Sequence, residues 1–200
     1  MGSSAFIVGV GITPLGRHFD KSVKALAAIA VREALADARC AVRDVQAAWF
    51  CNTRWGIFEG QHGIRGQVAL RPLGFEGIPI FNTDNACASS TAGLSLARAW
   101  ILSGAAEVAL VVGAEKMNYA NRRAEMFQAF KGSMDVENGE AQLQRLVELG
   151  SDLPVPEAEQ TAERSIFMDS YSAHARFHML RYGTTPAQLA STMKLEMDQL

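Results

Sequence analysis

The fold of this chain is decided by residues 77–104, GIPIFNTDNACASSTAGLSLARAWILSG. The short apolar run at 77–81 begins at a glycine and is typical of a buried strand. Small and polar residues follow it, and helical spacing then continues over 88–103 up to Gly104, which stands where a glycine commonly ends a helix. A strand, a tight polar turn and a helix in direct succession predict one unit of a parallel α/β layer.

The rest of the first 114 residues repeats this alternation. Apolar runs of strand length occur at 5–10, 45–51 and 107–112, and helical spacing occurs at 22–39 and, more weakly, at 61–70. Ser22 is a candidate N-cap for the first of these helices. Strands that alternate with helices in this way predict a layered βαβαβαβ domain with parallel crossovers over residues 1–114.

The pattern changes beyond residue 115. The segment 132–165 is acidic and contains Pro154 and Pro156, which predicts an irregular, solvated loop region with one helix at 140–148. Helical spacing returns at 165–182 and stops at Gly183. Thr185 as N-cap and Pro186 at the first helical position predict a last helix that runs to the end of the chain. We therefore expect an irregular and helical loop domain at 115–200 that is cut short.

Composition excludes several classes of protein. The 19 Lys and Arg residues balance 21 Asp and Glu residues for a net charge of −2, so the basic excess of a nucleic-acid-binding protein is missing. The apolar runs have the length of strands and are too short to span a bilayer, and the N-terminus lacks the pattern of a secretory signal. Three cysteines without a CxxC pair suit a reducing compartment. We expect a cytoplasmic protein that binds neither nucleic acid nor membranes.

Cys87 is the candidate with the most specific chemical setting. It stands where a strand ends and a helix begins, among small side chains that leave space for a substrate. The unpaired N–H groups of a helix N-terminus favour a thiolate and also point to where an oxyanion would form. Cys40 follows a helix end and Cys51 lies in an apolar strand. We therefore expect both to be structural thiols. This setting favours Cys87 as a nucleophile, with a buried packing residue as the alternative.

Two other motifs have simpler explanations. Gly9 and Gly11 follow an apolar run, but Pro14 occupies the third glycine position of the dinucleotide-binding fingerprint. His174 and His178 are one helical turn apart, and no neighbouring carboxylate or cysteine completes a metal-ligand set. We expect neither a nicotinamide cofactor nor a metal site.

Four stretches together resemble one family. Residues 85–90, NACASS, look like the nucleophile segment of thiolases, in particular of the branch related to sterol-carrier-protein-type thiolases. Residues 7–13 resemble the first strand of that family, and 111–117 resemble its Gly-x-Glu-x-Met segment. Residues 167–185 resemble the helix and turn of its loop domain. The four stretches agree in order and spacing with the N-terminal half of a thiolase.

The resemblance implies roles for individual residues. Cys87 would attack a 3-oxoacyl-CoA and hold the acyl group as a thioester, for thiolytic cleavage or the reverse Claisen condensation, and its backbone N–H would help to stabilise the oxyanion. Met168 matches a methionine that lines the pantetheine tunnel, and His174 would face the same tunnel. Arg122 and Arg123 would meet the phosphates of coenzyme A. Coenzyme A would be substrate and product, with no bound cofactor.

The resemblance also implies a missing part. Thiolases consist of two similar halves, and the second half supplies a Gly-His-Pro histidine and a second cysteine that are not found here. We therefore expect the site to be completed by further chain or by a second polypeptide, in a homo-oligomer such as a dimer. The alternative is a non-catalytic or aldolase-like subunit of thiolase fold that works with an accessory protein.

Overall fold

The computed structural model describes residues 4–148 and 166–191 of the chain. The chain divides between residues 133 and 134 into two compact units, each of which is described by itself. Helix α5 (Arg123–Lys131) therefore belongs to the first unit, together with the whole sheet.

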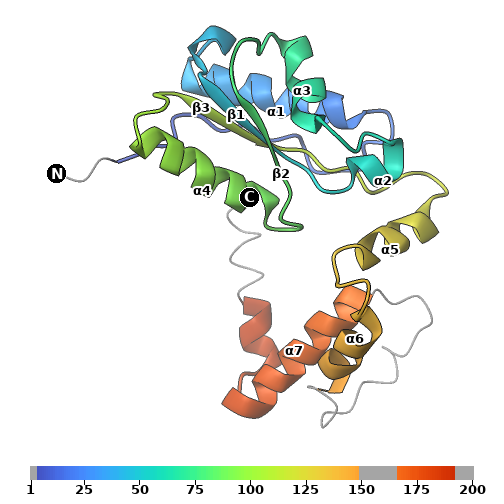
Figure 1. Cartoon of the computed structure of the whole chain (residues 1–200). Coiled ribbons are helices and arrows are strands. Elements are labelled where there is room, and N and C mark those ends of the chain that lie inside the picture. Colours follow the sequence, from blue (N-terminus) through green and yellow to red (C-terminus); the bar gives the residue numbers. More distant parts are fainter. Residues whose placement is uncertain (1–3, 149–165, 192–200) are drawn as a thin grey trace. The chain divides into compact units, whose positions relative to one another are not determined.

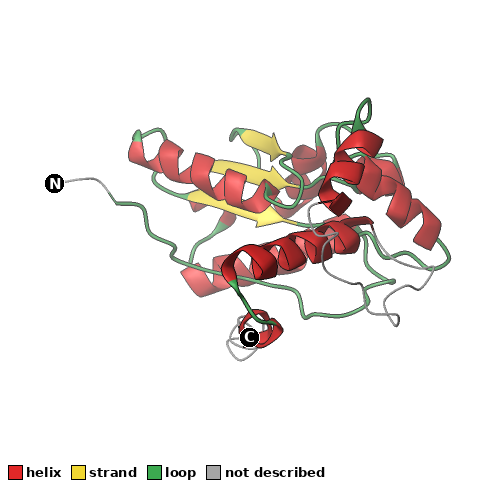
Figure 2. Cartoon of the chain, turned by 90° about the horizontal axis from the view of Figure 1, so that it is seen from below, coloured by secondary structure: helices red, strands yellow, loops and turns green. Residues whose placement is uncertain are grey.

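A parallel sheet of three strands forms the centre of the first unit (Figures 1 and 2). Strand β1 (Ala47–Cys51) lies between β2 (Ile80–Thr83) and β3 (Ala109–Gly113). In this register Trp49 lies between Phe81 and Val111. All five residues of β1 are buried, as expected for a strand that is covered on both faces. The α/β class with a parallel sheet is thus confirmed.

The two faces of β1 belong to two separate cores. Ala48 and Phe50 pack with residues of α1 (Val23–Ala38) and α3 (Arg65–Leu70). Trp49 and Cys51 point the opposite way, toward α4 (Ser89–Leu102), which covers the other face of the sheet (Figure 1). The Trp49 ring stacks on Phe81 with centroids 4.9 Å apart and meets Trp100 of α4 edge-on at 5.8 Å. The pleat of one strand therefore assigns each helix to its side.

The predicted first strand at 5–10 is wrong. Residues 4–14 take no part in the sheet, which has three strands rather than four among the described residues. The apolar side chains of this segment are exposed, and those of Phe6, Ile7 and Val10 show 82%, 72% and 66% of their surface. The apolar run is real, but its side chains do not enter either core.

Two glycines attach this N-terminal segment to α1 instead. A Cβ on Gly11 would collide with the Ala30 carbonyl oxygen, and one on Gly9 would lie 2.5 Å from that of Ala34. The close approach lets the Val10 N–H donate to the Asp37 carboxylate at 2.9 Å. The Ile12 N–H, two residues later, donates to the Glu33 carboxylate. Backbone groups that would pair with a strand are thus satisfied by carboxylates of a helix. This contact explains the Gly-Val-Gly spacing.

The predicted helices form close to the expected residues. The Ser22 hydroxyl accepts the Ala25 N–H at 3.2 Å and begins α1, and α4 ends before Gly104, whose φ is +78°. The sequence did not predict α2 (Trp55–Glu59) or α5. Two short 3₁₀ turns, Val42–Asp44 and Arg71–Leu73, complete the connections.

The second unit contains α6 (Gly139–Glu148) packed on α7 (Ile166–Tyr182). Gly183 follows α7 with φ +70°. The Thr185 N–H donates to the Gln188 side chain at 2.8 Å and the Gln188 N–H donates back to the Thr185 hydroxyl at 3.3 Å. This reciprocal cap confirms Thr185 as the start of a helix, which is described up to residue 191. Pro154, Pro156 and Leu200 lie outside the described residues.

None of the helices within residues 4–148 and 166–191 has both the length and the apolar character that crossing a membrane requires.

Helix α4 approaches the sheet so closely that Gly93 has no room for a side chain. A Cβ there would lie 2.5 Å from the Cys51 sulfur. Gly→Ala inside a helix ordinarily stabilises by about 1 kcal/mol. We expect Gly93→Ala instead to lower the free energy of unfolding by about 1–3 kcal/mol, as overpacking does. Urea unfolding of the full chain measures this.

The matched control is Gly63→Ala, because a Cβ at Gly63 meets nothing within 4 Å and its φ is not positive. Its unfolding free energy should stay within about 0.5 kcal/mol of the wild type. A Gly93→Ala chain that is more stable than the wild type would contradict the packing of α4.

Candidate functional site

The candidate site lies where the three parallel strands end. Asn52 and Thr53 follow β1, the segment 84–88 follows β2, and Glu115 follows β3 after a single intervening residue. The carboxyl ends of parallel strands share one edge of a sheet, and ligands of open α/β sheets bind at that edge. Segments that are more than thirty residues apart in the sequence therefore contact each other here.

Cys87 stands immediately before the helix that covers the sheet. Helix α4 begins at Ser89 with Ala88 as its N-cap residue. Cys87 is exposed, whereas Cys51 is buried and Cys40 is half-buried. Burial raises the pKa of the Cys51 thiol, although Thr83 and Ser90 oppose this with hydrogen bonds. The alternative that Cys87 is a buried packing residue is therefore wrong for this chain.

The residue before Cys87 has a strained backbone. Ala86 has φ +47°, in the left-handed region that costs a non-glycine residue about 1 kcal/mol. The Ser89 side chain holds this turn, because its hydroxyl donates to the Ala86 carbonyl at 2.7 Å and accepts the Asn85 N–H at 2.8 Å. Strain of this kind is typical of functional turns.

The amides around Cys87 differ in their partners. The Ala88 N–H donates to the Asn85 carbonyl and the Ser89 N–H donates to the Ala86 carbonyl. The Cys87 N–H finds no acceptor in the part of the chain that the structure describes. That N–H can therefore donate to a ligand beside the sulfur, as an oxyanion site requires.

Glu115 joins the end of β3 to the end of β1. Its carboxylate accepts the Thr53 N–H at 2.9 Å, the Arg54 N–H at 3.1 Å and the Asn52 side-chain amide at 3.0 Å. The residue as a whole is exposed, but the buried surroundings of its carboxylate raise the pKa of Glu115, an effect that these donors and the charges of Arg54 and Arg65 only partly offset. The sequence motifs did not predict this role of Glu115. The sequence signal for it is a carboxylate placed just after a buried strand.

Asn52 lies at the centre of the same edge and is only 2% exposed. Its amide donates to the Ala114 carbonyl at 2.7 Å, and its oxygen accepts from the Trp55 N–H at 3.2 Å and from the Arg65 guanidinium at 3.0 Å. Arg65 also pairs with the Asp84 carboxylate at 3.6 Å. Thus the turn that carries Cys87 is connected to all three strand ends by polar contacts.

The structure places the other predicted residues elsewhere. The Arg122 guanidinium donates to the Glu125 carboxylate and to the Phe58 carbonyl, the latter at 2.8 Å, so much of its hydrogen-bonding capacity is used within the chain. Met168 is exposed on α7, and the His174 ring lies 2.9 Å from the Ser170 carbonyl one turn earlier. Met168 and His174 belong to the second unit, so their sharing a site with Cys87 stays a prediction.

Arg123 lines a cavity of about 360 Å³ in the first unit. Its guanidinium lies 5.6 Å from the centre of the Phe127 ring. The other lining residues combine one more guanidinium and one amide with apolar and aromatic side chains: Arg17, Asn118, Phe19, Met117, Tyr119 and Met126. Sequence reasoning did not predict Arg17. The cavity combines positive charge with apolar walls.

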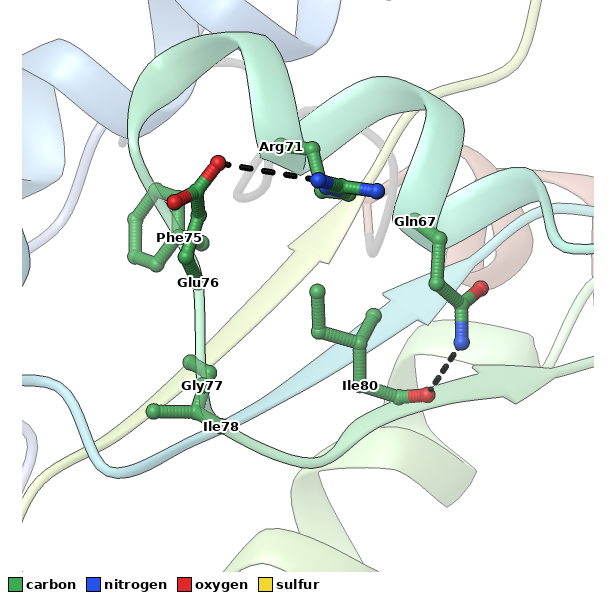
Figure 3. A pocket seen from close by; sticks show the side chains of 7 residues that line it. All are labelled: Gln67, Arg71, Phe75, Glu76, Gly77, Ile78 and Ile80. Carbon is green, nitrogen blue, oxygen red and sulfur yellow. Dashed lines mark hydrogen bonds and ion pairs between the residues drawn. The ribbon is translucent and has the colours of Figure 1, made fainter.

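A second cavity, of about 370 Å³, lies beside the beginning of β2 (Figure 3). Gln67 donates to the Ile80 carbonyl at 2.9 Å, and the exposed Arg71 and Glu76 side chains pair at 3.8 Å. Cys87 follows the opposite end of the same strand. This cavity therefore does not belong to the candidate site.

The two histidines of α7 have partners within the chain. Besides the His174 contact, His178 lies 2.9 Å from the Thr184 hydroxyl and 4.7 Å from the Tyr182 ring centre. Among the residues that the structure describes, no three His, Cys, Asp or Glu side chains gather as metal ligands would.

Comparison with known proteins places the sequence in a family. Residues 5–164 match the thiolase N-terminal domain. Non-specific lipid-transfer protein-like 2 of Caenorhabditis elegans is 40% identical over 119 residues, 56% of this chain and 26% of that protein. Sterol carrier protein 2 of Homo sapiens is 35% identical over 116 residues, 56% and 20% of the two chains. Acetyl-CoA acetyltransferase of Methanocaldococcus jannaschii is 33% identical over 111 residues, 56% and 28%.

The matched part thus spans about a quarter of the length of these relatives. Among solved structures, 3-oxoacyl-[acyl-carrier-protein] synthase III from Aquifex aeolicus is similar with a TM-score of 0.44 and 23% identity, over 49% of this chain and 31% of that one.

The raised pKa of Glu115 predicts how pH affects stability. The folded chain binds this proton more tightly than the unfolded chain, so the resulting stabilisation is full below the ordinary value of 4.5 and is lost as the pH rises through the folded pKa. The advantage of the wild type over Glu115→Gln in unfolding free energy should therefore grow as the pH falls from about 7 to the ordinary value of 4.5. Urea unfolding at both pH values measures it.

Glu125→Gln is the control with the opposite sign, because Arg122 lowers the pKa of Glu125. The advantage of the wild type over that variant should stay constant down to about pH 5 and should shrink only as the pH falls below the ordinary value of 4.5. The same slope for both variants would show that the environment assigned to Glu115 is wrong.

Proposed function

The chain belongs to the thiolase family, and we propose that it acts as a thiolase-type acyltransferase on 3-oxoacyl-CoA thioesters with Cys87 as the nucleophile. One observation carries this proposal. Cys87 is exposed on a strained strand-to-helix turn at the carboxyl edge of the sheet, and its own N–H has no acceptor within the described residues. Sulfur and donor are thus adjacent, as attack on a carbonyl requires.

In the proposed reaction the Cys87 thiolate attacks the ketone carbon of the 3-oxoacyl-CoA. The carbonyl electron pair moves to the oxygen, and this oxyanion accepts a hydrogen bond from the Cys87 N–H. When the carbonyl re-forms, the C2–C3 bond breaks. Its electrons leave on a CoA thioester enolate, which takes up a proton. The acyl group stays on the sulfur until the thiolate of a second coenzyme A attacks it and expels Cys87. The reverse sequence is a Claisen condensation.

The reaction needs a group that takes the thiol proton and returns one to the enolate. The hydroxyls that hydrogen-bond the turn belong to Ser89 and Thr53, and these hydrogen bonds within the chain already occupy both groups. We place the acid–base group in a completing segment or subunit, in a homo-oligomer such as a dimer, and we locate the protein in the cytoplasm.

For coenzyme A we propose contacts in both units. Arg123, now joined by Arg17, supplies positive charge beside apolar walls, which suits a phosphate-bearing ligand. Met168 and His174 would contact the pantetheine arm. Arg122 contributes less directly, because Glu125 and the Phe58 carbonyl already hold its guanidinium.

Covalent acylation tests the mechanism. The protein with its completing segment or subunit present, incubated with acetoacetyl-CoA, should gain one acetyl group, and peptide mapping by mass spectrometry should locate it on Cys87. Cys87→Ala should lose the label, and Cys40→Ala should keep it. Absence of the label in that folded, completed protein, or equal labelling of Cys40, would favour the non-catalytic or aldolase-like subunit over the acyltransferase.

Alkylation tests the exposure and chemistry of the sulfur independently. Iodoacetamide at neutral pH should modify Cys87 about tenfold faster than Cys51, because Cys51 is buried and its pKa is raised. Cys40, whose thiol donates to the Ala38 carbonyl at 3.5 Å, should also react more slowly. In urea the three rates should converge. Three similar rates in the folded chain would contradict the assignment of Cys87.

A further inference from the structure

Thr53 lies between the Glu115 contact and the turn that carries Cys87. It is half-buried and follows the buried Asn52 at the end of β1. Its hydroxyl lies 3.3 Å from the Ser89 hydroxyl and 3.4 Å from the Ala86 carbonyl oxygen. Neither the sequence motifs nor the proposed reaction uses this residue.

The direction of these hydrogen bonds follows from counting protons. A hydroxyl donates once and accepts twice. The Ser89 proton is on the short bond to the Ala86 carbonyl, at 2.7 Å, and one Ser89 lone pair accepts the Asn85 N–H. Thr53 must therefore be the donor, shared between the second Ser89 lone pair and the Ala86 carbonyl. Its proton completes the set of bonds that holds Ala86 at φ +47°.

The backbone of Thr53 is fixed from the other side. Its N–H donates to the Glu115 carboxylate at 2.9 Å, and the Arg54 N–H donates to the same group. A continuous series of contacts thus runs from the end of β3, through Thr53 after β1, to the turn after β2. A β-branched side chain has fewer accessible rotamers than an unbranched one, so less entropy is lost in aiming the hydroxyl.

We propose that Thr53 is a positioning residue for Cys87, which acts through Ser89 and the Ala86 carbonyl to keep the sulfur and the Cys87 N–H on the same side of the turn. This inference rests on the proposed role of Cys87 as nucleophile. Thr53 itself touches no reacting atom. Its loss relaxes the Ala86 turn, so the orientation of the thiol and of its N–H changes while the fold remains.

Thr53→Val tests the role, because it removes the hydroxyl and keeps the shape. The rate of Cys87 alkylation by iodoacetamide is measured by peptide mass spectrometry across pH, together with acetylation by acetoacetyl-CoA. We expect alkylation to slow by about fivefold, the effect of one hydrogen bond, with an altered pH profile. Thr53→Ser keeps the donor and should stay within about twofold of the wild type.

The matched control is Thr91→Val on α4, the helix that begins at Ser89, because Thr91 is exposed and its hydroxyl makes no hydrogen bond within the described chain. It should leave the rate and the pH profile unchanged. In the Thr53→Val, Ser89→Ala double variant the loss should be smaller than the sum of the two single losses, since Thr53 bonds Ser89 and both hydroxyls donate to the Ala86 carbonyl. Fully additive losses would overturn this route.

Unfolding in urea is recorded for each variant, and Thr53→Ala replaces Thr53→Val if the latter does not fold. Amide hydrogen exchange tests the turn in the wild type, without any substitution. The Ala88 and Ser89 amides should exchange with deuterium far more slowly than in an unfolded peptide. A folded Thr53→Val or Thr53→Ala chain with the wild-type rate and pH profile overturns the proposal, as does fast exchange at these amides.

The two proposals fail differently. If the wild type takes no acetyl group but Thr53→Val still slows alkylation, the positioning role stands and the acyltransferase function falls. If Cys87 is acetylated and Thr53→Val changes nothing, the function stands and the positioning role falls.

Discussion

Burial of β1 on both faces is the constraint on which the rest of the first unit depends. A strand that is covered on both sides needs a helix layer on each, and its pleat sends Phe50 to one layer and Trp49 to the other. The same burial forces the polar groups at the end of the strand to find partners in the protein, because little water reaches them. Asn52 and Glu115 are those partners, so the candidate site is the polar end of an apolar strand.

The polar edge in turn explains why a strained turn persists. Ala86 alone would avoid φ +47°, but Ser89 and Thr53 bond its carbonyl, and Glu115 fixes the backbone of Thr53. Each contact is modest, and together they connect three strand ends that are distant in the sequence. The position of Cys87 is thus a property of the sheet edge as a whole. The helix start alone does not determine it.

Local chemistry was predictable from the sequence, and long-range pairing was not. The caps at Ser22 and Thr185 and the strand-turn-helix unit at 77–104 depend on residues close together in the chain, and the structure contains them. The run at 5–10 has the composition of a strand, but a strand also needs a neighbour, and this segment contacts α1 instead. Glu115 was noted only as part of a family motif. Its contacts could not be predicted from the sequence, because its partners lie some sixty residues earlier.

The glycines at close contacts between elements have a consequence for the history of this sequence. Gly11 against the Ala30 carbonyl of α1 and Gly93 of α4 against the Cys51 sulfur of β1 leave no room for even a methyl group. Because even the smallest side chain does not fit, a substitution at these positions requires that the opposing helix or strand moves as well. Related sequences should therefore keep these glycines or change them together with the residues they face. A glycine spacing that imitates a nucleotide-binding fingerprint can thus be maintained by helix packing alone.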